Sequence, residues 1–218
     1  MMERMKQYKA RASRRYTAAE LTGLFFTFSV LGWLWEVALH IVFDGELVNR
    51  GTMLGPWLPI YGAGGVLAVL LLRRFADRPA AVFALGTALC SVIEFSAGRY
   101  LEAVYGLRWW DYSMYPLNID GLVCAQTSLV FGLGCCAAVY LAAPALAERF
   151  ARLPRMQARQ CCVLLLTLFA LDFGWSAANP NAGAGVTDYS VQQAAHADGT
   201  FSVIDVAHAA SAVHGLPK

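Results

Sequence analysis

Two acidic residues, Glu36 and Glu94, lie inside long apolar stretches of the chain. Ionisable side chains at bilayer depth are costly to bury, so by default they mark a functional site. His40 follows Glu36 by four residues, and this spacing places both side chains on one face of a helix. Two carboxylates on separate helices, with a histidine able to share protons, are the groups that form a proton relay or a cation site.

The depth of these acids predicts the side from which the site is reached. Counting about 1.5 Å per residue from the inner end of each segment, Glu36 lies about 22 Å up, Glu94 about 21 Å and Asp172 about 17 Å. All three fall in the middle-to-outer half of the membrane, so we expect a polar centre that opens outward. The structural alternative is that each acid only joins neighbouring helices by hydrogen bonds, which are worth about 1 kcal/mol each.

Two connecting segments supply further candidate binding residues: Asn49 and Arg50 in the first, and Asp111 in the second. Irregular backbone beside a membrane is tolerated only where protein covers it or where it lines a water-filled cavity. We expect Arg50 to pair with Asp111 and the two segments to form a lid over Glu36 and Glu94. The residues expected to shape them are Gly51, Gly55, Pro56, Pro59, Tyr61 and Gly62 in the first segment, and Trp109, Trp110, Tyr112 and Asn118 in the second.

The elements that carry these residues follow from the composition. The 218-residue chain is 58% hydrophobic and only 15% charged, whereas soluble domains average about 45–50% and about 25%. Several stretches that carry few or no charges have the length of a membrane-crossing helix. We predict an all-α, polytopic transmembrane helix bundle over residues 21–178, between a basic cytoplasmic segment (1–20) and an Ala/Gly-rich extracytoplasmic tail (179–218). The five predicted spans are residues 21–43, 57–72, 80–100, 121–143 and 161–178.

The distribution of Lys and Arg predicts the orientation. With the amino terminus inside, thirteen of the seventeen basic residues fall in cytoplasmic segments. Cytoplasmic connections carry this excess in membrane proteins. We therefore expect a cytoplasmic amino terminus and a carboxyl tail outside.

Several kinds of site find no support in the sequence. The chain has no GxxxxGK[ST] loop, so ATP coupling would need a separate P-loop ATPase subunit. The six cysteines show no CxxC spacing, and we predict neither a metal site nor a cofactor. The net charge of +2 is no footprint for nucleic acid.

Half of the chain also resembles a known family. The motifs that carry the resemblance are Phe28, Ser29, Gly32, Trp33 and Glu36; Asn49, Arg50 and Gly51; Gly55, Pro56, Pro59, Ile60, Tyr61 and Gly62; Glu94 and Gly98; and Trp109 to Ser113, Asn118 and Gly121. In combination they are similar to the bacterial ABC-transporter type IV permease family, over residues 25–143. The resemblance implies a multi-spanning protein of the bacterial inner membrane. Asp120 departs from the pattern, where a shorter polar joint before Gly121 would be expected.

Three functions remain open. The first is a permease-like transport component, in contact with membrane lipids, whose outward polar centre binds a solute or lipid head group. Five short spans form a poor pore alone, so this function would need a homo-oligomer or a second permease. The second is a membrane-embedded enzyme acting on a lipid or lipid-linked substrate, with Glu36 and His40 as an acid/base pair. Asn49, Arg50 and Asp111 would then hold a phosphate or metal, although the chain shows no evident nucleophile. The third is a non-catalytic scaffold subunit.

Overall fold

The computed structural model describes residues 11–187, and the rest of the predicted carboxyl tail and of the basic first segment lies outside this range. The described part of the chain is mostly helical, and it contains four helical segments long and apolar enough to cross a membrane. These segments are α2 (Ala18–Asp44), α4 (Pro79–Tyr105), the continuous run Ala125–Phe150, and α7 (Arg155–Ala178).

The second predicted span forms the shorter helix α3 (Pro59–Leu72), which has 14 residues and ends in the 3₁₀ turn η1 (Arg73–Phe75). A helix of this length covers about 21 Å, less than the hydrocarbon thickness of about 30 Å. Length and composition therefore support four spans, and α3 lies below the usual limit for a fifth.

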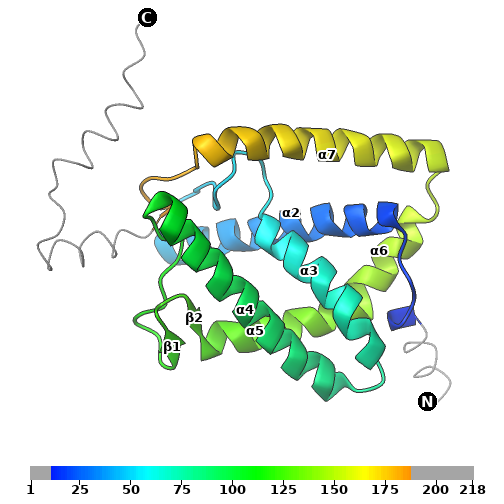
Figure 1. Cartoon of the computed structure of the whole chain (residues 1–218), viewed down its shortest axis with the longest axis horizontal. Helices are drawn as coiled ribbons and strands as arrows, with labels where there is room; N and C mark the ends of the chain where they lie inside the picture. Colours follow the sequence, from blue (N-terminus) through cyan, green and yellow to red (C-terminus); the bar gives the residue numbers. More distant parts are fainter. Residues whose placement is uncertain (1–10, 188–218) are drawn as a thin grey trace, which may run out of the picture.

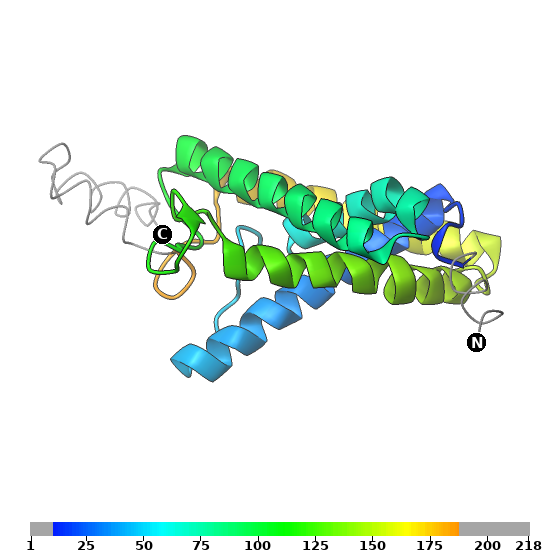
Figure 2. The same ribbon diagram turned by 90° about the horizontal axis from the view of Figure 1, so that it is seen from below.

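Successive helical segments run in opposite directions when the run Ala125–Phe150 is counted as one (Figure 1). The carboxyl-terminal ends of α2, α4 and α7 lie at the same end of the bundle as the hairpin of β1 (Asn118–Ile119) and β2 (Val123–Cys124) (Figures 1 and 2). The two connecting segments predicted to carry binding residues are therefore neighbours in space.

The start of α2 is defined by a reciprocal cap. Thr17 Oγ1 accepts a hydrogen bond from the backbone N–H of Glu20, and the Glu20 carboxylate accepts one from the backbone N–H of Thr17. Such a capping box satisfies donors that the first helical turn would leave unpaired. The helix ends at Gly45, which takes a left-handed conformation at φ 75°.

The fourth predicted span began too early and ended too early. Gly121 lies in a turn and residues 123–124 form strand β2 (Val123–Cys124), which pairs with β1 (Asn118–Ile119) in an antiparallel hairpin. The helix α5 (Ala125–Ala137) follows, then the π-helical turn η2 (Ala138–Ala142) and α6 (Ala143–Phe150). Pro144 lacks a backbone N–H and its ring crowds the preceding turn, which accounts for the widened turn before it.

The hydrophobic core lies where α2, α3, α4 and the α5–α6 run meet, toward the η1 end of the bundle. Leu24, Val69, Val82 and Val139 are almost completely buried there. By contrast, α7 packs mainly on α2 and exposes most of its leucines, as a lipid-facing helix would.

Candidate functional site

Glu36, on α2, contacts two residues of the following segment. The hydroxyl of Tyr61, in the first turns of α3, donates to Glu36 Oε1 over 2.5 Å. The Nε of Arg50 lies 3.9 Å from Glu36 Oε2. The Glu36 side chain is 29% exposed, so one of the two predicted carboxylates is reachable from outside the bundle.

The contact between Glu36 and Tyr61 depends on a close approach of α2 and α3. A Cβ on Gly32 would lie 2.3 Å from Tyr61 Cγ, and a Cβ on Gly62 would lie 2.1 Å from Ser29 Oγ. The backbone N–H of Leu58 also donates to the carbonyl of Ser29 over 3.0 Å. Only residues without side chains allow the helices to meet this closely.

Glu94, on α4, is 5% exposed and receives a hydrogen bond from the second connecting segment. The hydroxyl of Tyr112 donates to Glu94 Oε1 over 3.0 Å. Within residues 11–187, the buried Glu94 Oε2 has no hydrogen-bond partner. A buried carboxylate oxygen without a donor is costly, so this atom favours a proton or another positive group beside it.

The two carboxylates act on the same phenol. Burial raises the pKa of Tyr112 above its ordinary value, and the negative charges of Glu94 and then Glu36 raise it further. Tyr112 therefore stays a neutral donor at any physiological pH. Together, Glu36, Tyr61, Glu94 and Tyr112 form what we call the polar centre.

Arg50 brings positive charge to the polar centre, and its position is set by backbone carbonyls. Its guanidinium donates to Gly185 O at 2.9 Å, to Val186 O at 2.8 Å and to Trp109 O at 3.0 Å. Arg50 thus joins the first connecting segment, the second, and the chain that follows α7.

The predicted pair between Arg50 and Asp111 was wrong. The ion pairs among residues 11–187 place Asp111 with Arg108 at 3.4 Å, and Asp111 also accepts hydrogen bonds from the backbone and hydroxyl of Ser113. Arg108 is only three residues from Asp111 on the same segment, and this short separation brings the two side chains together. Asp111 therefore stabilises the second segment from within.

The second connecting segment is held by a chain of alternating charges. Glu102 pairs with Arg108 and with Arg99, and Arg99 pairs with Asp120 at 2.5 Å. Asp120 has φ 52° in the tight turn of the hairpin. The residue that departs from the family pattern thus has a charged partner on α4.

His40 and Asn49 have partners other than the polar centre. His40 Nδ1 lies 3.0 Å from Asp44 Oδ2, one turn further along α2. Asn49 accepts a hydrogen bond from Trp33 Nε1 at 2.6 Å and donates to Leu54 O at 2.9 Å. Asn49 folds the first segment back on α2, and His40 does not contact Glu36.

The residues expected to shape the segments have specific contacts. Gly51 has φ 92°, a left-handed backbone conformation that residues with a Cβ rarely adopt. Pro59 begins α3, where a missing N–H is harmless. In the second segment, Trp110 Nε1 donates to Leu122 O at 2.9 Å and Asn118 Nδ2 donates to Tyr115 O at 2.8 Å.

Asp172 serves the first segment and not the polar centre. It accepts hydrogen bonds from Leu54 N at 3.1 Å, Gly55 N at 2.8 Å and Trp57 Nε1 at 2.7 Å. The predicted depth groups Asp172 with Glu36 and Glu94, and nothing in the spacing points to the first connecting segment.

Asn181 is a positioning residue that the sequence did not reveal. Its side chain donates to Asn49 O at 2.7 Å and Gly51 O at 3.1 Å, and its carbonyl accepts from Trp109 Nε1 at 3.0 Å. The first residues of the predicted tail, up to Thr187, thus pack on both connecting segments.

The described residues form no cluster of three or more His, Cys, Asp or Glu side chains able to hold a metal ion. The site offers instead two carboxylates, two phenols and one guanidinium, an arrangement suited to hydrogen bonding and to binding positive charge.

Comparisons with known proteins agree with the resemblance of the motifs. A family model described as "Putative ABC-transporter type IV" matches residues 23–177. No curated protein and no solved structure matches the chain. The match covers most of the chain and includes the polar centre and both connecting segments. The chain is therefore a multi-pass, transport-related membrane protein that belongs to the ABC-transporter type IV family.

Proposed function

We propose that this protein is a permease-like component of a transport system, and that its polar centre binds a positively charged group arriving from outside the cell. The observation that carries the proposal is the charge balance of the polar centre. Glu36 and Glu94 bring two carboxylates, whereas Arg50 brings one guanidinium, 3.9 Å from Glu36. One further positive charge beside the unpartnered Glu94 Oε2 balances the centre.

The proposed orientation rests on the basic residues. We place the amino terminus and the Arg73–Arg78 connection in the cytoplasm of a bacterial cell, and both connecting segments outside. In this topology α3 is a short fifth crossing. Met114, which is 95% exposed in the second segment, faces the outside.

Cysteine labelling tests this topology. In a variant without native cysteines, Met114→Cys should react with a membrane-impermeant maleimide added to intact cells. The matched variant Arg78→Cys should react only after the membrane is opened. The opposite pattern, or equal reactivity of both, contradicts the orientation.

The contacts of three candidate residues favour transport over enzymatic chemistry. His40 pairs with Asp44 and not with Glu36, so the acid/base pair of an enzyme is not assembled. Asn49 bonds to Trp33 on α2 and to Leu54 O, and Asp111 pairs with Arg108, so both side chains have structural partners. These residues support a fixed outer rim around the polar centre.

Energy for transport would come from a separate P-loop ATPase, docked on the basic inner connections. Cross-linking in native membranes, co-purification and mass spectrometry test this part of the proposal. Recovery of a P-loop ATPase in stable proportion supports ATP-driven transport. Recovery of the protein alone, or only with copies of itself, contradicts ATP coupling and leaves binding at the polar centre to be measured directly.

A further inference from the structure

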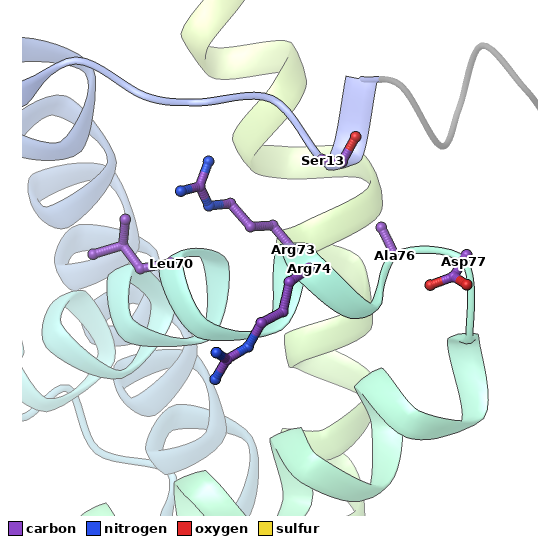
Figure 3. Close-up of a pocket in the computed structure, with 6 residues that line it drawn as sticks. All are labelled: Ser13, Leu70, Arg73, Arg74, Ala76 and Asp77. Carbon is purple, nitrogen blue, oxygen red and sulfur yellow. The ribbon is translucent and has the colours of Figure 1, made fainter.

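A second polar site lies where α3 ends, at the opposite end of the bundle from the hairpin. A pocket of about 390 Å³ is lined there by Ser13, Leu70, Arg73, Arg74, Ala76 and Asp77 (Figure 3). We propose that this pocket binds the phosphate of an anionic phospholipid from the adjacent leaflet, with Arg74 and Arg73 as its charged contacts. The inference is independent of the function proposed for the polar centre.

The charges around the pocket leave it positive. Asp77, the one acidic residue that lines it among the residues that the structure describes, lies 3.7 Å from Arg78. The ion pairs among residues 11–187 include none for Arg73 or Arg74. Arginine recognises phosphate through a planar fork of donors, so two arginines without carboxylate partners suit a phosphate group.

Arg73 is held in place by the segment that precedes α2. Its Nη1 donates to the carbonyl of Arg14 at 2.8 Å, a neutral acceptor that leaves the charge of the guanidinium uncompensated. The nearby guanidinium of Arg14 is itself paired with Glu20 at 2.5 Å. The positive charge of Arg73 is therefore fixed at the pocket and available to an anion.

An apolar stripe on α3 leads to the pocket, and it selects a lipid over a soluble phosphate. Leu67 and Leu71 are 39% and 40% exposed, and together with Arg74 they follow the spacing of one helical face. The side chains of Arg73 and Arg74 leave the end of α3 on opposite sides of the helix (Figure 3). An acyl chain along the leucines would place its phosphate at the arginines, in the manner of basic pockets between membrane helices.

The test uses the full-length protein in nanodiscs that contain either phosphatidylcholine alone or phosphatidylcholine with phosphatidylglycerol. Native mass spectrometry then measures the phosphatidylglycerol retained by each variant. We expect Arg74→Gln to lower the apparent affinity about fivefold, and the Arg73→Gln/Arg74→Gln pair about 25-fold. The control Arg155→Gln, on an exposed arginine at the start of α7 that does not line the pocket, should retain phosphatidylglycerol like the wild type.

Arg74→Gln keeps the bond between Arg73 and Arg14, so the test stands even where loss of Arg73 disturbs the fold. Equal retention of phosphatidylglycerol by the wild type and Arg74→Gln overturns the proposal. A further arm adds inorganic phosphate to the protein in phosphatidylcholine alone and follows its melting temperature. Stabilisation by phosphate that Arg74→Gln abolishes, without selective retention of phosphatidylglycerol, also overturns it, because the pocket would then hold a free anion.

Discussion

The hydroxyl of Tyr112 donates to Glu94 Oε1 over 3.0 Å, and this bond joins the second connecting segment to the buried carboxylate on α4. Glu94 is nearly fully buried, and its second oxygen has no partner among residues 11–187. The bond therefore leaves Oε2 as the oxygen of Glu94 at which a positive group would meet the carboxylate.

Replacing Tyr112 with Phe removes the hydroxyl that Glu94 accepts from and leaves both carboxylate oxygens without a donor. We expect Tyr112→Phe to lower stability by about 1–3 kcal/mol, because an unsatisfied buried acceptor keeps its full desolvation cost. Thermal denaturation in detergent measures the change. Tyr115→Phe, on a half-exposed neighbouring ring, serves as control and should stay within about 0.5 kcal/mol of the wild type.

Gly32→Ala would place a Cβ 2.3 Å from Tyr61 Cγ and push Tyr61 away from Glu36. We expect a loss of about 1–3 kcal/mol, typical of an overpacked helix contact. Gly134→Ala, on α5, meets no atom within 4 Å and should not destabilise the protein. Equal melting temperatures for the two variants would contradict the close packing of α2 on α3.

Asp172→Asn tests the anchor of the first connecting segment. In the asparagine side chain, an NH₂ group replaces one of the two carboxylate oxygens. This NH₂ group would face the N–H of either Leu54 or Gly55, so two donors would meet without an acceptor. We expect about 1–2 kcal/mol lower stability and faster proteolysis within residues 46–58. Ser176→Ala removes only the hydroxyl bond to Asp172, 3.0 Å long, and should give a smaller effect on both measurements.

Arg50→Lys keeps the charge near Glu36 but loses the planar fork that reaches three carbonyls. We expect residues 185–186 to leave the connecting segments. In a background without native cysteines, a Val186→Cys reporter, 7% exposed in the wild type, should then react faster with a maleimide. Unchanged labelling in the Arg50→Lys background would show that the guanidinium does not hold this part of the chain.

The sequence predicted the helices well and their ends poorly. Apolar stretches indicated each membrane helix, but α4 continues past Tyr100 to Tyr105 because Glu102 finds basic partners in Arg99 and Arg108. Composition alone also predicted helix over residues 121–124. In the structure Gly121, with a positive φ, lies in the turn that leads into strand β2.

The candidate site was predicted in part. The helical faces of Glu36 and Glu94 follow from residue spacing, and the two acids accept hydrogen bonds from Tyr61 of α3 and Tyr112 of the second connecting segment. Arg50 donates to the carbonyls of residues 185–186, which follow α7, and to that of Trp109. No local sequence pattern predicts that these segments pack beside Arg50. His40 was assigned to Glu36 by the same four-residue spacing that places it beside Asp44.

Binding of a small cation to the purified protein tests the account most directly. Isothermal titration of the full chain in nanodiscs should use Na⁺, methylammonium and tetramethylammonium at fixed pH. A dye assay of proton release on binding completes the measurement.

We predict saturable binding of at least one of these cations, or its exchange for a proton, in the wild type. Glu94→Gln and Glu36→Gln should weaken that binding at least about 30-fold, as loss of a buried charged partner does. Glu46→Gln, on an exposed acid outside the polar centre, should bind like the wild type. Equal binding by wild type and Glu94→Gln, or the absence of both binding and proton release in the wild type, would contradict the proposed role of the polar centre.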